Sequence, residues 1–315
     1  MKVLVVTNMF PTLDEPWFGS FVSDQVDDLR ELGFEMCVLQ IEGRHDRVDY
    51  VRAARRMRST VARTGVDLVH AHYGLSGAIA LAQRTVPVVT TLHGSDYTGQ
   101  IWWHAWVSWL VVRRCTPIFV SAEGPRRLRC SRGCVIPVGV DTELFAPFDR
   151  AEAREALGWP TNRRYVLLPG PRTDPGKRAD LFDSAFREAQ RTASDLERVS
   201  LDGFSRREVA LVMNAVDVTL MTSDREGSPV AIKESLACMT PVVSVAVGDV
   251  PELIAGLPGC AIVPREPTAL AMAVVASLES PRRVELRHRA EEFSRTAVAE
   301  RVSALYSDVV RGSGA

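Results

Sequence analysis

The sequence predicts an α/β fold with two doubly wound parallel sheets. Short, continuously apolar runs of strand length alternate with helical patterns along the whole chain. Strands that are apolar on both faces and separated by helices are typical of parallel sheets covered on both sides. The pattern restarts near the middle, and 315 residues suffice for two domains of about 150 residues each.

The first half of the chain predicts strands and helices in alternation. In the helix at Phe21–Leu32, Val22, Val26 and Leu29 recur at helical spacing and Gly33 provides a stop. The expected strands are Val3–Thr7, Met36–Ile41, Asp67–His72, Val86–His93, Pro117–Ser121 and Cys134–Val138. The other expected helices are Val48–Arg63, Leu75–Arg84 and Ile101–Arg114.

A polar stretch, Glu143–Thr161, carries Pro147 and Pro160 and suits a linker. The expected strands beyond it are Tyr165–Pro169, Arg198–Leu201, Val218–Ser223, Pro241–Val247 and Cys260–Val263. The expected helices are Arg178–Arg191, Arg206–Val216, Ser228–Cys238, Pro251–Ala255, Thr268–Leu278, Arg282–Phe293 and Ala297–Val310. We therefore expect domains at residues 1–148 and 149–295, followed by a terminal helix within 296–315.

Composition narrows the function classes. A net charge of −1 gives no basic surplus for nucleic acid, and 46% hydrophobic with 24% charged residues are typical of a globular protein. The cysteines are scattered. Cys130 and Cys134 are close, but no second pair at zinc spacing accompanies them, so we expect reduced thiols and no metal site. The chain starts directly with a strand and shows no signal-peptide pattern, which predicts a cytoplasmic location.

The second half is organised around residues 224–234, which follow a strand and open a helix. Ser228 suits the N-cap of that helix, and Pro229 suits its first position. Glu226 precedes the helix and Glu234 lies within it, so two carboxylates bracket the positive end of a helix. A nucleotide sugar, with a polyol at each end and a diphosphate between them, fits that layout.

Cations follow the first strand of the second half. The loop there contains Arg172 and Lys177, which can converge on one anion, and Lys177 is one of only three lysines in the chain. Exposed loop charges without a function are the alternative. No Asp-x-Asp triplet, which commonly holds the metal in metal-dependent glycosyl transfer, occurs in the sequence. We therefore expect Arg172, Lys177 and the helix N-terminus to neutralise the diphosphate without a metal cofactor.

Polar residues also follow strands in the first half. Gly19 ends the loop after the first strand and would let the backbone approach a phosphate or a substrate, although an ordinary loop is the alternative. His70 and His72 share one side of the third strand, and His93 follows the fourth. These histidines could bind a metal, but no carboxylate ligand is evident. We therefore favour His93 as a single active-site histidine and a structural role for His70.

Together these residues resemble the retaining GT-B glycosyltransferases of family 4, whose E-x7-E signature corresponds here to Glu226–Glu234. The likeness continues in Asn214–Asp217 before the strand and in Cys238–Val243 after the helix, with Met239 where the family usually has Gly. Val135–Phe145 is similar to the interdomain segment of the family. The resemblance implies two Rossmann-like domains facing across a cleft, and a final helix that packs back on the N-terminal domain.

The resemblance also implies an activity. It is the retaining transfer of a hexosyl group from a nucleotide-diphosphate donor, with a UDP-sugar of the UDP-GlcNAc type as first choice. The acceptor would be a hydroxyl in cell-envelope polysaccharide, glycolipid or natural-product biosynthesis, and a lipid-linked acceptor fits this class. A GT-B sugar-nucleotide epimerase is one alternative, although its acid–base carboxylates are not evident. A non-catalytic nucleotide-sugar-binding partner protein is the other.

Roles for single residues follow from the same resemblance. Glu226 would contact the donor sugar, Glu234 would bind the ribose, and Arg172 with Lys177 would hold the diphosphate. His93 would line the sugar pocket. The further donor-side residues are Gly19, Gly227, Ser228, Pro229, Val230, Phe204 and Arg206, and the acceptor-side candidates are Phe18, His72, Tyr73 and Asp96.

The helix expected at Ile101–Arg114 holds four of the six tryptophans. Trp102, Trp106 and Trp109 fall on one helical face and are followed by a pair of arginines. Peripheral contact with the inner face of a membrane, or with a lipid acceptor, is one interpretation. Packing of this face in the core is the interpretation that we favour.

Overall fold

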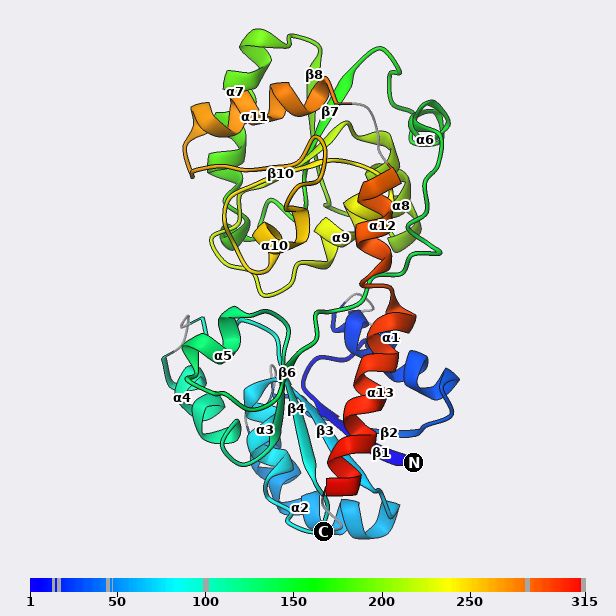
Figure 1. The fold of residues 1–315 in the computed structure, drawn as a ribbon, viewed down its shortest axis with the longest axis vertical. Coiled ribbons are helices and arrows are strands. Elements are labelled where there is room, and N and C mark those ends of the chain that lie inside the picture. Colours follow the sequence, from blue (N-terminus) through cyan, green and yellow to red (C-terminus); the bar gives the residue numbers. More distant parts are fainter. Residues whose placement is uncertain are drawn as a thin grey trace. The chain divides into compact units, whose positions relative to one another are not determined.

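The computed structural model describes residues 1–12, 15, 18–43, 46, 48–98, 102–280 and 284–312. They form two compact units (Figure 1). Unit 1 comprises Met1–Gly139 and Arg295–Ala315, and unit 2 comprises Val140–Ser294. The chain thus leaves unit 1 after Gly139 and returns to it after Ser294, whereas the sequence suggested boundaries at 148 and 295.

Unit 1 is built on a parallel sheet that has, among the described residues, the strand order β2-β1-β3-β4-β5-β6. The strands are β1 (Lys2–Thr7), β2 (Glu35–Gln40), β3 (Leu68–His72), β4 (Val88–Leu92), β5 (Thr116–Phe119) and β6 (Cys134–Val135). The helices are α1 (Ser20–Glu31), α2 (Val48–Thr64), α3 (Gly74–Ala80), α4 (Trp102–Val111), α5 (Glu123–Arg127) and α13 (Arg295–Gly312).

Strand β1 shows why this sheet is covered on both faces. Val3 and Val5 pack in a core with residues of α1 and α13, whereas Leu4 and Val6 pack in a second core with residues of α2 and α3. Side chains alternate between the faces of a strand, so a continuously apolar strand feeds two cores. The expected doubly wound arrangement is confirmed for this unit.

Unit 2 repeats the design with the strand order β11-β10-β9-β7-β8 among its described residues. Its strands are β7 (Arg164–Leu168), β8 (Leu196–Ser200), β9 (Val218–Met221), β10 (Val242–Ser244) and β11 (Ala261–Ile262). Its helices are α6 (Arg150–Ala156), the 3₁₀ turn η1 (Pro175–Lys177), α7 (Ala179–Thr192), α8 (Arg206–Ala215), α9 (Val230–Ala237), α10 (Val250–Ile254), α11 (Pro267–Leu278) and α12 (Val284–Glu291).

The polar stretch expected to be a linker contains helix α6, so that expectation was wrong. Asp149 caps the helix by accepting hydrogen bonds from the backbone N–H groups of Ala151 and Glu152. Arg154 on α6 is buried and donates to the Asp217 carboxylate over 2.7 Å at the start of β9. At least one charge of this stretch, that of Arg154, is therefore bound within unit 2, while others such as Glu152 and Glu155 are exposed.

Helix α4 forms where expected, but its tryptophans do not pack in the core. Trp102, Trp103, Trp106 and Trp109 are 78%, 41%, 56% and 38% exposed. The buried residues of α4 include Ser108, which lies where a side chain on Gly74 of α3 would have to be. The helix therefore approaches α3 through its small residues, and its large aromatic side chains face outward.

Candidate active site

The candidate site of unit 2 lies where the winding of its sheet reverses. From β7 the chain winds to β8 on one side and to β9, β10 and β11 on the other, and β7 pairs directly with β9. In sheets of this kind, ligands bind beyond the carboxyl ends of the strands at the reversal point. The loops after β7 and β9 meet at that point, and they carry Lys177 and Glu226.

The loop after β7 is shaped to present Lys177. The Asp174 carboxylate accepts a hydrogen bond from the N–H of Gly176 over 2.8 Å and caps the η1 turn, which ends at Lys177. The lysine side chain runs over Gly170, where an added Cβ would come within 2.7 Å of Cε. Gly170 thus leaves room for the path of this cation.

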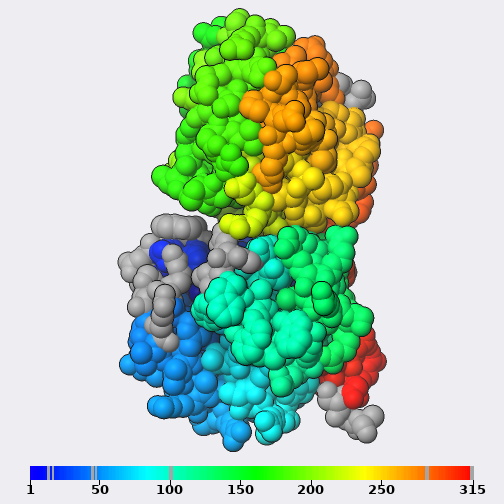
Figure 2. All heavy atoms as spheres, turned by 90° about the vertical axis from the view of Figure 1, so that its left-hand side faces the viewer, coloured from blue at the N-terminus to red at the C-terminus, as the bar shows by residue number. Residues whose placement is uncertain are grey.

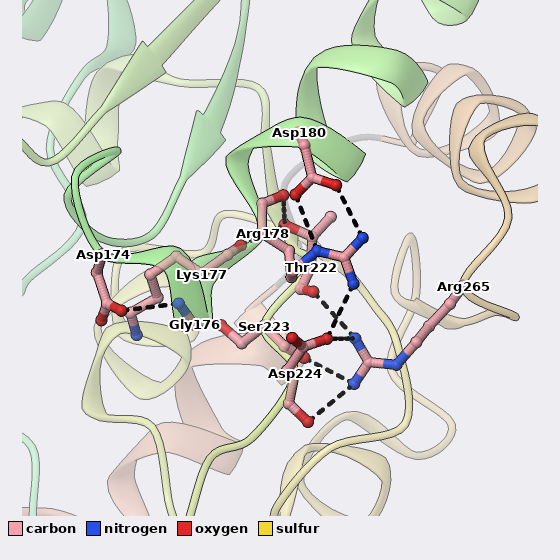
Figure 3. Close-up of polar contacts among 9 residues, drawn as sticks. All are labelled: Asp174, Gly176, Lys177, Arg178, Asp180, Thr222, Ser223, Asp224 and Arg265. Atoms are coloured by element: carbon pink, nitrogen blue, oxygen red, sulfur yellow. Dashed lines mark hydrogen bonds and ion pairs between the residues drawn. The ribbon is translucent and has the colours of Figure 1, made fainter.

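The two loops are joined by hydrogen bonds near the strand ends (Figure 3). The N–H of Asp224 donates to the carbonyl of Gly176 over 2.9 Å, and the Thr222 hydroxyl donates to the carbonyl of Lys177 over 2.8 Å. Arg178 and Arg265 both reach the Asp224 carboxylate, over 3.1 and 3.2 Å. Because both backbone and side-chain groups of the two loops bind each other, the position of one loop is fixed relative to the other.

Lys177 and Glu226 form the ion pair at the centre of this arrangement. The lysine Nζ lies 2.7 Å from Oε1 of the glutamate, and the two side chains are 19% and 15% exposed. A pair with this exposure is partly shielded from water, yet a ligand can still reach it. It therefore offers a cation and a hydrogen-bond acceptor to one ligand.

The start of α9 differs from the expectation in one respect. Pro229 occupies the N-cap position without a side-chain hydrogen bond, and Ser228 does not cap the helix. The Ser228 hydroxyl instead accepts from Lys233 Nζ over 2.5 Å and donates to Asp249 over 2.6 Å. The Ser228 hydroxyl is bonded to both Lys233 and Asp249, and this explains why it does not cap the helix.

Lys233 is buried completely one turn into α9. Burial lowers the pKa of Lys233 to about 8, while burial raises the pKa of Asp249. Asp249 also supports the loop, because its N–H donates to the carbonyl of Gly227 over 3.2 Å. This network therefore fixes the backbone immediately after Glu226.

The other donor-side candidates of unit 2 lie on several of its loops and helices. Arg172 pairs with Asp183 over 2.5 Å and Lys177 pairs with Glu226, so the two cations bind separate carboxylates in this structure. Glu234 is half-buried on α9, and Phe204 is half-buried in the loop after β8. Arg206 begins α8 and lies 6.0 Å from the Phe145 ring. Gly227 and Val230 flank the N-cap position of α9.

In unit 1 three histidines lie next to one another across β3 and β4, with His70 and His72 buried and His93 partly buried. Nδ1 of His72 lies 3.1 Å from Nε2 of His93, while His70 contacts Tyr306 over 2.5 Å and Thr91 over 2.8 Å. Burial lowers the pKa values of His70 and His93 to about 3 and that of His72 well below its usual range. These rings are therefore neutral at physiological pH.

A cavity of about 710 Å³ lies beyond the strand ends of unit 1. It is lined by loop residues after β1, β2, β3 and β4 together with residues of α2, α3 and α4, and its lining includes Phe18, Tyr73, Trp103 and His104. The Tyr73 hydroxyl contacts Nδ1 of His104 over 2.8 Å. A cavity of this size, with aromatic walls and few polar groups, is typical of a small-molecule site.

Two other predicted residues of unit 1 have structural partners. Asp96 is fully buried, accepts from the N–H of His93 over 3.1 Å, and has its pKa raised to about 7 by burial. Gly19 has φ +71, and a side chain there would collide with the backbone of Met9 and Phe10. The close approach that requires glycine at this position is therefore one to the chain's own loop.

Comparisons with known proteins decide the family. A family model described as "Glycosyltransferase Family 4" matches residues 18–144, and one described as "Glycosyl transferases group 1" matches residues 175–280. The chain belongs to the family 4 glycosyltransferases. Its two α/β units are the Rossmann-like domains of the GT-B fold.

Among curated relatives of this family 4 member is TuaC of Bacillus subtilis, whose name assigns it to teichuronic acid biosynthesis. It is 22% identical over 348 aligned positions, which cover 87% of this chain and 88% of TuaC. The D-inositol 3-phosphate glycosyltransferase of Mycobacterium bovis is 28% identical over 231 positions, which cover 59% of this chain. The alignment spans about half of that relative, 48% of its length.

Solved structures share the fold at lower identity. Sucrose-phosphate synthase from Thermosynechococcus elongatus superposes with a TM-score of 0.79 at 17% identity and 99% coverage of both chains. HepE of Anabaena in complex with UDP superposes with a TM-score of 0.72 at 16% identity, covering 98% of this chain and 100% of HepE. These likenesses establish the fold.

At position 239, where the family usually has glycine, the backbone adopts a conformation that favours glycine. Met239 follows α9 with φ +57, in the left-handed region that favours glycine. The backbone conformation at this position is therefore the one that glycine adopts most easily, although the residue is a methionine.

Several residues of the unit 2 site went unnoticed in the sequence. Arg178, Asp224 and Arg265 join the two loops, and Asp249 pairs with Ser228. Lys233, the third lysine in the chain, was likewise given no role in the sequence analysis. The available signal was its rarity, because the chain has only three lysines. Among the described residues, no group of three or more His, Cys, Asp and Glu side chains could hold a metal ion.

Proposed function

We propose that this glycosyltransferase transfers a hexosyl group from a UDP-sugar to a hydroxyl acceptor, with retention of configuration and without a metal. The Lys177–Glu226 ion pair at the winding reversal of unit 2 is the observation that carries the proposal. Solved HepE structures contain UDP and UDP-glucose, which supports UDP as the nucleotide. UDP-GlcNAc is our first choice of donor.

The ion pair suggests how donor binding prepares the reaction. The diphosphate would draw Lys177 away from Glu226, and the freed carboxylate could then accept hydrogen bonds from the sugar hydroxyls. Arg172 and the first-turn N–H groups of α9 would add positive potential for the phosphates. As the bond to the sugar breaks, negative charge builds up on the diphosphate, and its attraction to these positive groups grows. An interaction that is stronger in the transition state than in the ground state lowers the barrier to bond cleavage.

The transfer step balances without a protein base. The bond between the anomeric carbon and the diphosphate oxygen breaks, and the leaving electron pair stays on UDP. The acceptor hydroxyl oxygen bonds to the same face of the anomeric carbon, and its proton passes to the departing phosphate oxygen. Lys177 and Arg172 would stabilise the diphosphate, Glu234 would bind the ribose, and His93 would contact the transferred sugar. The absence of an Asp-x-Asp triplet from the sequence supports this metal-free scheme.

The acceptor would bind in unit 1. Its cavity of about 710 Å³ can hold a sugar or another hydroxyl compound, and Tyr73 and His104 supply polar atoms in aromatic walls. The name of TuaC supports an acceptor in cell-envelope polysaccharide synthesis, and a lipid-linked acceptor fits such synthesis. Since nucleotide sugars are made inside cells, we propose a cytoplasmic location.

A donor screen tests this function. The protein is incubated in EDTA with a panel of UDP-, GDP- and dTDP-sugars, and released nucleotide and free sugar are measured by mass spectrometry. We expect slow hydrolysis of one UDP-sugar with the α-anomer as first product. An epimerised donor would identify the sugar-nucleotide epimerase, and a donor that binds without turnover would identify a non-catalytic binding protein. Turnover that requires added Mg²⁺ or Mn²⁺ would contradict the metal-free scheme.

A further inference from the structure

Helix α4 carries a row of exposed aromatic side chains in unit 1. Trp102, Trp103, Trp106 and Trp109 are 78%, 41%, 56% and 38% exposed. A tryptophan has roughly 250 Å² of surface at most, so these rings leave a large apolar area in water. Exposed patches of this kind mark interaction sites.

The segment formed by α4 and the residues that follow it is strongly cationic. Residues 102–132 contain six arginines and one carboxylate, Glu123, which gives this segment a net charge of +5, although the whole chain has −1. The arginines are Arg113, Arg114, Arg126, Arg127, Arg129 and Arg132, and all are exposed. Glu123 pairs with Arg127 over 2.5 Å. We call the exposed tryptophans and arginines of residues 102–132 the patch. Its charge complements a surface of negative charge.

Aromatic and cationic groups are also in direct contact here. The Arg113 guanidinium lies 3.6 Å from the centre of the Trp109 ring, at the end of α4. Figure 2 shows the blue-green residues around 100–130 on the face of unit 1 turned toward the viewer, the side on which Figure 1 draws α4 and α5. Apolar and cationic groups thus belong to one surface.

The patch is continuous with the cavity of unit 1. Trp103, His104 and Val107 of α4 line that cavity, whereas Trp102 and Trp106 are among the most exposed side chains of the helix. One helix therefore separates a ligand-sized cavity from an exposed aromatic surface. A ligand that is anchored at that surface would have its polar end close to the cavity.

We infer that α4 and the arginines up to residue 132 dock unit 1 on an anionic lipid bilayer. Tryptophans place their rings among lipid headgroups with the apolar body toward the chains, and arginines bind lipid phosphates. No helix within the described residues is long and apolar enough to cross a bilayer. The docking is therefore peripheral, and it brings the cavity to the level of lipid headgroups. The inference extends the proposed function by placing its acceptor site at a membrane, but does not depend on the transfer reaction.

A second copy of the chain is the competing occupant, since aromatic residues and arginine are also common in protein interfaces. The charge of the patch favours lipid, because two copies would bring two surfaces of net charge +5 together. A symmetric interface, in which the same segment of two copies meets, would need acidic residues in this segment, and Glu123 is already paired with Arg127.

Vesicle sedimentation of the full chain tests the docking. Vesicles of phosphatidylcholine alone are compared with vesicles containing phosphatidylglycerol, and binding is expected only to the second kind. Arg113→Gln/Arg114→Gln should reduce partitioning by about 25-fold, since each arginine near an anionic surface contributes roughly fivefold. Trp102→Gln/Trp106→Gln should reduce it by at least about tenfold.

Matched variants in unit 2 serve as controls. Arg187 and Arg191 are exposed arginines on α7, and Met272 is a 69% exposed apolar residue on α11. Arg187→Gln/Arg191→Gln and Met272→Gln should leave partitioning unchanged. Circular dichroism and UDP calorimetry on every variant confirm folding and separate lipid docking from donor binding.

Three outcomes would overturn the inference. They are equal sedimentation with neutral and anionic vesicles, unchanged partitioning in both patch variants, and a concentration-dependent dimer that the tryptophan variant abolishes. The last outcome, measured by analytical ultracentrifugation without lipid, would assign the patch to a second copy.

Discussion

Nζ of Lys177 lies 2.7 Å from Oε1 of Glu226, and this contact bridges the loops after β7 and β9. Lys177 and Glu226 each have a separate role in the proposed reaction. In the free protein they bind each other instead of a substrate. In that reaction the diphosphate would bind the Lys177 ammonium, and the sugar would bind the Glu226 carboxylate. Donor binding would therefore exchange one ion pair for another, and this exchange can be tested by removing one charge at a time.

Glu226→Gln removes the carboxylate charge and keeps the side-chain shape. We expect turnover to fall by about 10²- to 10³-fold, because an interaction with the reacting sugar is weakened. UDP affinity should stay the same or rise, because Lys177 no longer has an anionic partner. Steady-state kinetics and calorimetry check the two parts. Weaker UDP binding together with normal turnover would show that the roles have been assigned wrongly.

Glu234→Ala should act on the nucleotide and not on the chemical step. The loss of a hydrogen-bonded carboxylate costs about 1.5–3 kcal/mol, so we expect UDP to bind roughly 10- to 100-fold more weakly. Turnover at saturating donor should change little. Glu155→Ala on the exposed face of α6 is the control. Unchanged UDP affinity would exclude Glu234 from the ribose site.

Lys233→Met should destabilise the protein by about 3 kcal/mol, because it leaves the Asp249 carboxylate buried without its cation. Lys233→Met/Asp249→Leu should recover most of this loss, and urea unfolding at pH 7.5 measures both. The folded pKa of Lys233, about 8, lies below its usual 10.5, so Lys233 contributes a rise in stability between pH 8 and 10.5. The Lys233→Met variant should lack that rise, and an identical pH profile in variant and wild type would contradict the assignment.

The histidines of unit 1 should make it sensitive to acid. Their folded pKa values lie well below 6.5, so unfolding takes up protons and stability falls as the pH drops below 6.5. Asp96 opposes this trend, because its folded pKa of about 7 lies above the usual value. His70→Gln should flatten the slope between pH 6.5 and 5 by about 1 kcal/mol per pH unit. Urea midpoints across that range measure the slope, and an unchanged slope would contradict the prediction.

Met239→Gly should stabilise unit 2 by about 1 kcal/mol, since glycine adopts the left-handed region without steric cost. Thermal unfolding measures the gain. Leu157, the residue after α6, has φ −87 and provides the control, because Leu157→Gly at that position should destabilise. A loss of stability in Met239→Gly would mean that the methionine side chain contributes more than its backbone costs.

The sequence was sufficient for the fold because its strongest signals are local. The apolar run from Val3 to Val6 implies a strand buried on both faces, and the structure places its side chains in two cores. The helix α6 was missed because its pattern is polar. One of its stabilising contacts joins Arg154 and Asp217, which lie 63 positions apart in the chain.

The site was only partly predictable for a related reason. Spacing singled out Glu226, Glu234 and Lys177, since they share loops and a helix end. The pairing of Lys177 with Glu226 spans 49 positions and depends on the adjacency of β7 and β9. The prediction that Ser228 caps α9 was wrong because its acceptor, Asp249, lies beyond the next strand.

Calorimetric titration of UDP in EDTA tests the central claim most directly. The wild type, Lys177→Met and the control Arg191→Gln are compared under identical conditions. We predict saturable binding at one site per chain in the wild type and the control, and binding weakened by about 100-fold in Lys177→Met. No heat with the wild type, or equal affinity in all three proteins, would contradict a metal-free donor site built on Lys177 and Glu226.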